Sequence, residues 1–574
     1  MPGGDAGVMK YCRAPKTTAA SRSMPARRIF ASLIVLLALP WALEAQAGKS
    51  TVCTVTVNSP NEKETLRRIL PEDKFQFVEL VERGRPDWLA SACRQQLRCD
   101  VLVVSGHFDG GTEFYSDRLD ARESLPVAEL ERASCSASCS GLFSQLKEVY
   151  LFGCNTLNAA APDSTASEVA RSLVRAGYSR GDADRVSRAL NERHGESNRD
   201  GMRRIFASVP VIYGFSAMAP LGATAGPLLG RHLLSSGGGE FGTGRASASL
   251  LGQFAGSSMT VTSGLSDADP RAGYRREVCQ FFDEQRSPAQ KLAFIHQILR
   301  RDMAEVRMFF ERIEAFYASL SADDRHAPAF VEQSDEIARD QLARDRYLAF
   351  ARDVDRPQIR SRMVHVARTL GWLSPEDEKA EITRMVGELL AGSAVGSAEV
   401  DLVCSLNGDR SLDDQLPRLE RSPLRKENVS SAALLACLGS AEDRRRVLQA
   451  LTARTDADVE IARVYLRHHP ITDVNEIRDV AARIARMTES DAQVRALDTL
   501  AHYYLADRES LDQLTRLFPV ATSVNVQRAI AGVFIRSDYR ALPRQDLVRM
   551  LRQYRLKSPD GEDLIDVLIR RLQA

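Results

Sequence analysis

The chain has 574 residues, of which 44% are hydrophobic and 27% are charged, and its formal net charge is +1. This length exceeds what one hydrophobic core usually serves, so the sequence predicts two to four soluble globular domains. A charge balance so close to neutral gives no basic surface field, which argues against a nucleic-acid-binding protein and against binding to an anionic membrane surface.

The first 47 residues have the pattern of a secretory signal peptide. Arg27 and Arg28 precede an apolar run at 29–43, and small residues follow at 45–47. A basic start, an apolar middle and small residues at the cleavage point together mark an export signal. The apolar run is short for a membrane span, although an uncleaved anchor is the alternative.

We therefore expect a secreted or periplasmic protein with no stable membrane insertion after cleavage of the signal. Met24 stands directly before the basic pair, so residues 1–23 are alternatively an over-extended start. Without residues 1–47, the chain keeps 71 basic and 74 acidic residues, which leaves it close to neutral.

Cysteines of an exported chain normally form disulfides. Nine lie beyond the signal: Cys53, Cys93, Cys99, Cys135, Cys139, Cys154, Cys279, Cys404 and Cys437. Nine is odd, so at least one thiol stays free or pairs between chains. The short spacings favour local bridges between Cys93 and Cys99 and between Cys135 and Cys139. No Cys/His pair at zinc spacing accompanies them, so we expect no metal site and no cofactor.

Strands and helices alternate through the first part of the mature chain. The predicted strands cover 51–57, 75–80, 101–104, 149–152 and 209–215, the last despite Pro210, and the predicted helices cover 62–70, 86–97, 166–176 and 224–234. Such alternation predicts a doubly wound, parallel α/β sheet. We assign residues 48–267 to this domain.

The β signal ends near residue 268, and the remainder is predicted to be helical. Ser287 and Gln290 have the spacing of a helix capping box. Apolar residues then recur at intervals of three and four between Met303 and Leu320, as on an amphipathic helix. We assign residues 268–400 to a helical linker domain.

Three segments in residues 401–574 share one apolar register, at offsets of about 35 and 32 residues, and each precedes a second predicted helix. Their apolar positions are Val459, Ala462 and Leu466; Val494, Leu497 and Ala501; and Val526, Ala529 and Val533. Two-helix units of this period indicate an α-solenoid of the HEAT or armadillo kind, which would bind a protein partner. An ordinary helical bundle is the alternative.

A histidine and a cysteine follow two of the predicted buried strands. His107 comes after the strand at 101–104 in the sequence S-G-H-F-D-G-G, and Cys154 comes after the strand at 149–152 in F-G-C-N-T. Ligands of open α/β sheets bind at the carboxyl ends of the strands, so both side chains are expected at one rim. A thiol beside an imidazole is the minimum for a cysteine nucleophile, since the imidazole favours the reactive thiolate.

This order of strand, S-G-H, helix, strand and G-C resembles the caspase-like clan of cysteine peptidases, which includes caspases, metacaspases, gingipains, separases and CHAT-type relatives. The resemblance covers roughly residues 50–265 and rests on two short motifs, with a histidine about 50 residues before the cysteine. It implies a cysteine endopeptidase or amide hydrolase acting on a protein or peptide. Cys154 would be the nucleophile, and His107 would protonate the leaving amine.

The resemblance also implies an oxyanion site made by backbone N–H groups of Phe108 and Cys154. We assign Asp109, Gly110, Gly153 and Ser216 to the surrounding pocket. Two departures stand out: the clan usually has glycine where this chain has Phe108, and relatives that cleave after basic residues often have aspartate where this chain has Phe152. Cleavage after Arg or Lys therefore has no support.

Other functions remain open. A cysteine after a buried strand is often a core residue, so the alternative is a catalytically inactive caspase-like domain in an envelope scaffold that binds proteins. Transamidation through the same thioester is a third reading. Ser216 lacks the closing glycine of a nucleophile elbow, and His468 and His469 at a helix end suit the helix dipole better than a metal.

Overall fold

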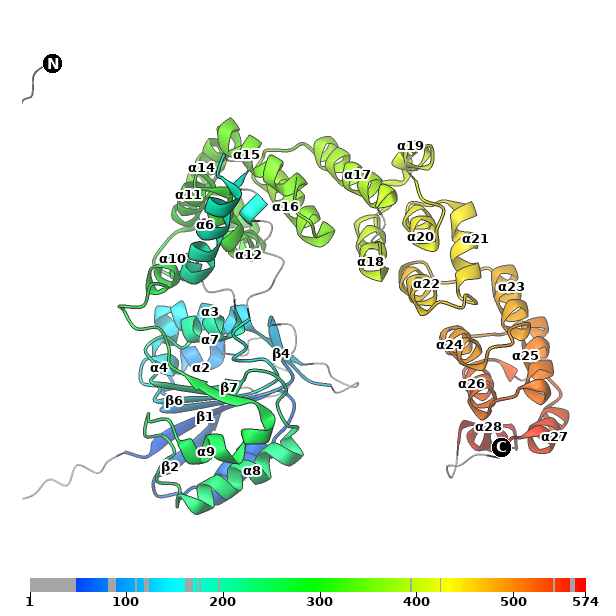
Figure 1. The fold of residues 1–574 in the computed structure, drawn as a ribbon, viewed down its shortest axis with the longest axis horizontal. Helices are drawn as coiled ribbons and strands as arrows, with labels where there is room; N and C mark the ends of the chain where they lie inside the picture. The colour runs from blue at the N-terminus through cyan, green and yellow to red at the C-terminus, as the bar shows by residue number, and fades with distance from the viewer. Residues whose placement is uncertain are drawn as a thin grey trace, which may run out of the picture. The chain divides into compact units, whose positions relative to one another are not determined.

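The computed structural model describes residues 48–80, 89–108, 111–117, 123–160, 169–171, 173–174, 177–194, 197–392, 395–423, 425–539, 542–557 and 563–573 (Figure 1). The chain divides into two units, Met1–Gly48 and Lys49–Ala574. The predicted signal peptide at 1–47 lies outside the described residues. None of the helices in the described ranges combines the length and the apolar character that crossing a membrane requires.

The N-terminal part of the second unit is an α/β region built on a six-stranded, mostly parallel sheet. The strands lie in the order β2 (Phe75–Glu79), β1 (Ser50–Thr56), β3 (Val101–Ser105), β6 (Glu148–Phe152), β7 (Val211–Phe215) and β8 (Met259–Thr262). The first five strands are parallel, and β8 runs antiparallel to β7. This confirms the predicted α/β class and the five predicted strands, while β8 was not foreseen.

Helices cover both faces of this sheet, which explains why its central strands are apolar throughout. One face carries α1 (Asn61–Ile69), α8 (Gly222–Ser235) and α9 (Ala248–Gln253), and the other carries α2 (Ala90–Arg94), α3 (Val127–Cys135), α4 (Ser140–Phe143) and α7 (Asn198–Ile205) (Figure 1). Successive strand residues point to opposite faces. Val103 and Tyr150 therefore join the core under α8, and Val104 and Leu151 join the core under α3.

Two of the predicted helices fall partly on residues that the structure does not describe. Of 86–97, the described helical part is α2, and of 166–176, residues 169–171 and 173–174 are helical. Helix α6 (Arg180–His194) follows and contacts α12 (Met303–Ser319).

A small second sheet pairs β4 (Glu113–Tyr115) with β5 (Ser124–Pro126), and the short helix η1 spans Ala137–Cys139.

Eight of the nine cysteines form four disulfides, and Cys154 is free. The pairs are Cys53–Cys99, Cys93–Cys139, Cys135–Cys279 and Cys404–Cys437. The predicted local bridges are wrong, because the sheet and its helices bring together sulfurs that are far apart in sequence. Cys93 and Cys139, for example, come from α2 and η1, which pack side by side.

From residue 272 onward, the described elements are helical. They are α10 (Ala272–Phe282), α11 (Pro288–Leu299), α12, α13 (Ala322–His326), α14 (Pro328–Arg339), α15 (Gln341–Arg352), α16 (Pro357–Thr369), α17 (Pro375–Ala391), α18 (Ser397–Leu406), α19 (Leu416–Glu420), α20 (Val429–Cys437), α21 (Ala441–Ala450), α22 (Asp456–His468), α23 (Val474–Ala485), α24 (Ser490–Leu500), α25 (Arg508–Val520), α26 (Val524–Ile535), α27 (Arg544–Tyr554) and α28 (Leu564–Gln573). The predicted capping box of Ser287 and Gln290 starts α11. The predicted apolar period is that of α12, where Val306, Phe310 and Ile313 are buried.

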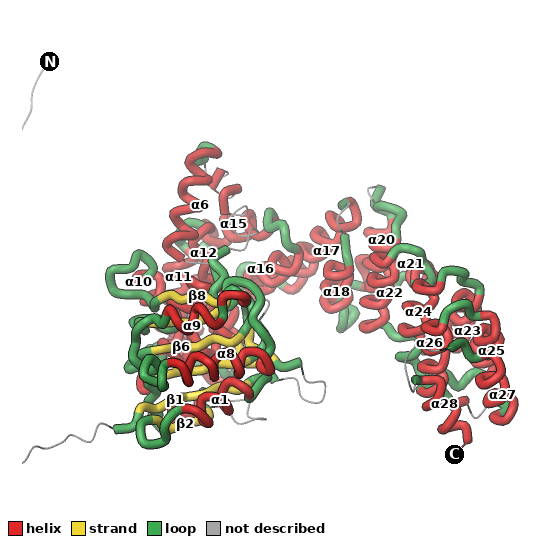
Figure 2. The backbone as a smooth tube through the Cα atoms, turned by 60° about the horizontal axis from the view of Figure 1, so that its bottom comes forward, coloured by secondary structure: helices red, strands yellow, loops and turns green. Residues whose placement is uncertain are grey.

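The last helices pack as two neighbouring rows (Figure 2). One row contains α22, α24, α26 and α28, and the other contains α21, α23, α25 and α27. The shared apolar register faces the core between the rows, where Ala462, Leu497 and Val526 are almost completely buried. The C-terminal part is thus a region of many helices, as predicted.

A buried ion-pair cluster joins the α/β region to the helices that follow it. The carboxylate of Glu131 on α3 accepts hydrogen bonds from Arg204 Nε at 2.8 Å and from Arg312 Nε and Nη2 at 3.1 and 3.0 Å. Burial alone would raise the pKa of Glu131, but the two guanidinium groups outweigh it and lower the pKa to about 2. Close by, the disulfide Cys135–Cys279 links α3 to α10.

We predict that Glu131→Gln lowers the free energy of unfolding by about 3 to 5 kcal/mol, because it leaves Arg204 and Arg312 buried without their counter-charge. The carboxylate stays charged in the folded chain down to about pH 2, whereas the unfolded group protonates near pH 4.5. Its stabilising contribution is therefore complete above pH 4.5 and is lost as the pH falls towards 2. Urea unfolding at pH 7 and pH 3 measures both effects.

Glu129→Gln on the same helix is the matched control. Glu129 pairs with Arg132 at the surface, three residues along the helix, so its loss should cost no more than about 1 kcal/mol. Equal costs for the two variants would contradict the assigned role of Glu131.

Candidate active site

The two strands that carry the predicted dyad are neighbours in one register. Strand β3 pairs with β6 from Val101 opposite Glu148 to Ser105 opposite Phe152. The pairing continues past the strand ends, since the Gly106 N–H donates to the Phe152 carbonyl at 3.0 Å. Residues facing each other on adjacent strands stand about 4.8 Å apart. His107 and Cys154 each come two residues after the last paired residue of their strand, at the carboxyl rim of the sheet.

Gly153 allows the two strand ends to approach this closely. A Cβ at this position would lie 2.8 Å from Phe108 Cβ and 2.9 Å from the Gly106 carbonyl oxygen, both too short for real contacts. Glycine is therefore required because the backbone that precedes His107 and the backbone that precedes Cys154 touch directly.

The turn that carries Cys154 is fastened to the end of β7. Asn155 adopts a left-handed conformation with φ of 60°, and its N–H donates to the Ala217 carbonyl at 2.7 Å. The buried Thr156 hydroxyl donates to the Gly153 carbonyl at 3.1 Å and accepts from the Phe215 N–H at 3.0 Å. These bonds determine where the thiol lies relative to the loop that follows β7.

The Cys154 thiol is free and partly exposed, so it is neither paired nor sealed in the core. Its sulfur accepts a hydrogen bond from the Ala219 N–H at 3.3 Å. This contact ties the thiol to the loop that follows β7. The Ala219 N–H was not foreseen from sequence, because it comes from a loop 65 residues downstream.

His107 is held by the small second sheet. Its backbone forms a two-way bridge with Tyr115, with both N–H to carbonyl distances at 2.9 Å, and the two rings lie 5.4 Å apart. Asp117 Oδ2 lies 3.3 Å from the imidazole Nε2. The two atoms are close without forming an aligned hydrogen bond, since Nε2 has no hydrogen-bond partner among the described residues. Asp117 is thus an acid beside the imidazole, and the sequence did not single it out.

The remaining predicted site residues lie in different surroundings. Phe108 turns its ring into the core against Phe114, with ring centres 4.6 Å apart, so its bulk is taken up by the core. Ser216 is exposed, and its hydroxyl donates to the Ser258 carbonyl at 3.2 Å, which anchors the loop that holds Ala219. Asp109 and Gly110 lie outside the described residues.

Two backbone N–H groups lie at this rim, one after β3 and one after β6. In the part of the chain that the structure describes, the N–H groups of Phe108 and Cys154 donate to no carbonyl or side chain. They are the pair expected to bind an oxyanion, and donors without an acceptor suit that task.

Glu62 is a buried carboxyl near the same rim that sequence reasoning missed. It lies in the first turn of α1, is 2% exposed, and its Oε2 has no hydrogen-bond partner among the described residues. Burial raises the pKa of Glu62, and hydrogen bonds with its own backbone, Ser59 and Ser105 only partly counter this. Ser105 is the last residue of β3 and stands two residues before His107. The Glu62 carboxyl therefore contacts the end of the strand that precedes the imidazole.

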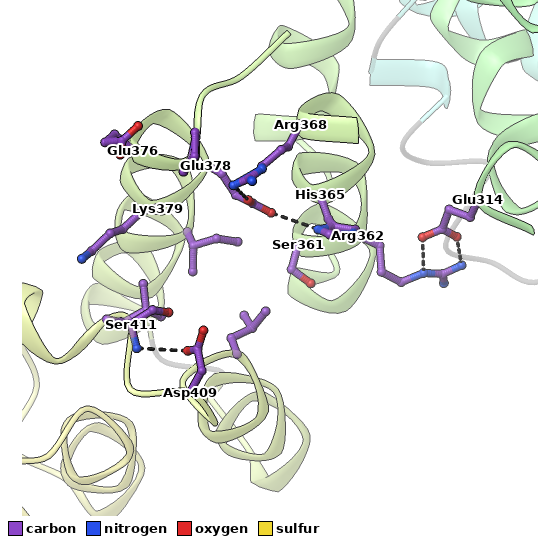
Figure 3. Close-up of a pocket in the computed structure, with 14 residues that line it drawn as sticks. Glu314, Ser361, Arg362, His365, Arg368, Glu376, Glu378, Lys379, Asp409 and Ser411 are labelled. Atoms are coloured by element: carbon purple, nitrogen blue, oxygen red, sulfur yellow. Dashed lines mark hydrogen bonds and ion pairs between the residues drawn. The ribbon is translucent and has the colours of Figure 1, made fainter. Parts of the chain in front are cut away.

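A separate cavity of about 610 Å³ lies between α16, α17 and α18 and includes neither His107 nor Cys154 (Figure 3). Its charged walls are largely neutralised in pairs. Arg362 Nε donates to Glu314 at 3.0 Å, while His365 Nδ1 and Arg368 lie 3.1 and 3.2 Å from Glu378. Such a cavity suits binding, but it offers no nucleophile with a neighbouring base.

We predict that Gly153→Ala destabilises the protein by about 1 to 3 kcal/mol, because the added methyl group has to push Phe108 and Gly106 apart. The control is Gly252→Ala in α9, where nothing lies within 4 Å of the new Cβ. That change should stabilise the helix by about 0.5 to 1 kcal/mol. Denaturant unfolding compares the two variants, and a neutral effect of Gly153→Ala would contradict the close approach.

Glu62→Gln should change how stability depends on pH. The unfolded carboxyl loses its proton near pH 4.5 and the folded one only at higher pH, so the wild type loses stability as the pH rises above 4.5. The amide has no proton to lose and removes this decline. Unfolding at pH 4 and pH 8 should show the variant gaining relative to the wild type at pH 8, and an unchanged difference would refute the assignment.

Comparison of the chain with protein-family models, with curated proteins and with solved structures finds no match. The function of this site is therefore argued from its own geometry. That geometry comprises a free thiol after β6, an imidazole after the neighbouring strand β3, an acid beside the imidazole, and two backbone N–H groups that have no acceptor among the described residues.

Proposed function

We propose that the chain is an exported cysteine endopeptidase or amide hydrolase with a His107–Cys154 dyad, in which a helical-repeat region binds a protein partner or substrate. The observation that carries the proposal is the placement of Cys154. It is the free cysteine of nine, it is partly exposed, and it follows its strand by the same two residues as His107 follows the neighbouring parallel strand.

The chemistry follows from the contacts at the rim. Cys154, whose sulfur accepts a hydrogen bond from the Ala219 N–H, attacks as a thiolate the carbonyl carbon of the scissile amide. The oxyanion that forms is bound by the N–H groups of Phe108 and Cys154. The His107 imidazolium, with Asp117 beside it, gives a proton to the leaving amine, and water then hydrolyses the thioester.

A caspase-like arrangement of the α/β region belongs to the same proposal. It is supported by five parallel strands with helices on both faces, and by a histidine and a cysteine that follow adjacent strands in that order. The departure from the clan at Phe152 remains. Relatives that cleave after basic residues often have an aspartate at this position, whereas Phe152 is apolar and buried in the core under α8, so cleavage after basic residues has no support.

A HEAT- or armadillo-like solenoid is the reading we favour for the C-terminal helices. It is supported by the two rows that α21 to α28 form and by the regular apolar register within them. Repeats of this kind present extended surfaces to protein partners. The cavity between α16 and α18 and a smaller polar one beside α23 and α25 would serve such a partner.

Export to the periplasm or the exterior is likewise proposed. Four disulfides support it, because such bonds persist in oxidising compartments.

The test uses a peptidyl electrophile that reacts with catalytic thiols, together with turnover of a mixed peptide library. The wild type should label at one site and cleave peptides. Cys154→Ala should abolish both, and His107→Ala should slow cleavage by about 10² to 10⁴, the usual contribution of a general acid or base. His468→Gln in α22, where His468 Nε2 contacts Asp401 at 2.8 Å, changes nothing at this rim and should retain activity.

Two outcomes would contradict the proposal. Labelling that survives Cys154→Ala would identify another cysteine as the reactive one. A wild type that labels no faster than a free thiol and cleaves nothing would favour the scaffold, in which the α/β region is catalytically inactive. Transfer of the acyl group to an added amine, in place of hydrolysis, would indicate transamidation.

A further inference from the structure

Three residues in the C-terminal helices bring ligand-type atoms together. They are Cys404 in α18, Cys437 at the end of α20 and His469 immediately after α22. Their two sulfurs and one ring nitrogen all lie within 4.8 Å of one another. Among the described residues, no other group of three cysteine, histidine or acidic side chains converges in this way.

A ring nitrogen of His469 lies within 4.8 Å of both sulfurs. Its Nε2 is buried and has no hydrogen-bond partner among the described residues, although buried polar nitrogens are normally paired. The ring stacks on Tyr465 with centres 5.1 Å apart. Arg444 donates to both the Tyr465 hydroxyl and the His469 carbonyl, at 3.0 and 3.2 Å, and so holds the ring in place.

The three residues come from or directly follow alternate helices of the chain, α18, α20 and α22, which pack on one another. Cys404 and Cys437 are 33 residues apart, and His469 follows at nearly the same interval, so the spacing matches one two-helix unit. Helices α18, α20 and α22 contact each other pairwise. The disulfide ties only α18 to α20, whereas a ligand that used all three residues would also tie in α22.

We propose that, once the Cys404–Cys437 disulfide is reduced, these two cysteines and His469 bind a zinc ion. Zinc prefers tetrahedral sites with thiolate and imidazole ligands, and two cysteines with one histidine form a recognised protein set that leaves a fourth position for water. Two thiolates balance the charge of the divalent ion, which offsets the presence of Arg444.

The chemistry requires a dithiol reductant. Thiol–disulfide exchange transfers two electrons and two protons to Cys404 and Cys437, and the reductant leaves as a disulfide. Zinc then displaces the two thiol protons and accepts the lone pair of His469 Nε2. The disulfide and the metal site are alternative states of the same two sulfurs, so zinc binding reports the redox state of this part of the chain.

Cobalt(II) is the probe, because its bonds to thiolates give a charge-transfer absorption that zinc lacks. The full-length protein is reduced under nitrogen, freed of reductant, titrated with cobalt and then back-titrated with zinc. We expect a thiolate band that saturates at one equivalent and is displaced by zinc. The oxidised wild type should give no such band, and this comparison requires no variant that might misfold.

Two variants locate the site, with a neighbouring histidine as the matched control. Cys404→Ser with Cys437→Ser should abolish the band even though all other cysteines are still reduced. His469→Gln should weaken zinc binding by about 100-fold or more, beyond the usual loss of an outer-shell partner. His468→Gln should leave it unchanged, because His468 Nε2 contacts Asp401 at 2.8 Å instead.

Three results would overturn the proposal. They are an equal band in the oxidised protein, a band that persists in the double serine variant, and equal zinc affinities for His469→Gln and His468→Gln. None of these results bears on the His107–Cys154 dyad, so the two proposals stand or fall separately.

Discussion

The direct contact between two parallel strand ends is the constraint on which the candidate site depends. At Gly106 and Gly153 the backbones of β3 and β6 meet with no room for a Cβ at Gly153. The pairing of the two strands extends to Gly106, and His107 and Cys154 follow directly after this contact. The sheet brings the two strand ends to one rim, and the glycine contact lets them approach closely.

The sequence predicted well what depends on neighbouring residues. Strands β3 and β6 were foreseen because they are continuous apolar runs, and the start of α11 was foreseen because Ser287 and Gln290 have the spacing of a capping box. Cys154 was expected after a strand because an apolar run precedes it. A free thiol was expected because nine cysteines cannot all pair within one chain. These signals are local, or they follow from the rule that parallel strands end at one rim.

What the sequence did not reveal depends on contacts across the fold. Asp117 reaches the imidazole only because a β-bridge folds Tyr115 back onto His107, and the Ala219 N–H reaches the thiol from the loop after β7. Strand β8 is short and pairs antiparallel at the edge, so its M-T-V-T sequence carries little signal of its own. The disulfides were mispaired for the same reason, because spacing along the chain does not determine which sulfurs meet.

The free state of Cys154 in a disulfide-rich chain follows from strand length. Cys99 stands before the start of β3, and Cys53 pairs in register with Leu102 near that start, whereas Cys154 follows the last residue of β6. Five residues of strand span about 16 Å, and a disulfide needs Cα atoms within about 7 Å. Oxidation therefore joins Cys53 to Cys99 at one end of the sheet and cannot reach the thiol at the other. The geometry of the sheet therefore accounts for a free thiol at Cys154 in a chain with four disulfides.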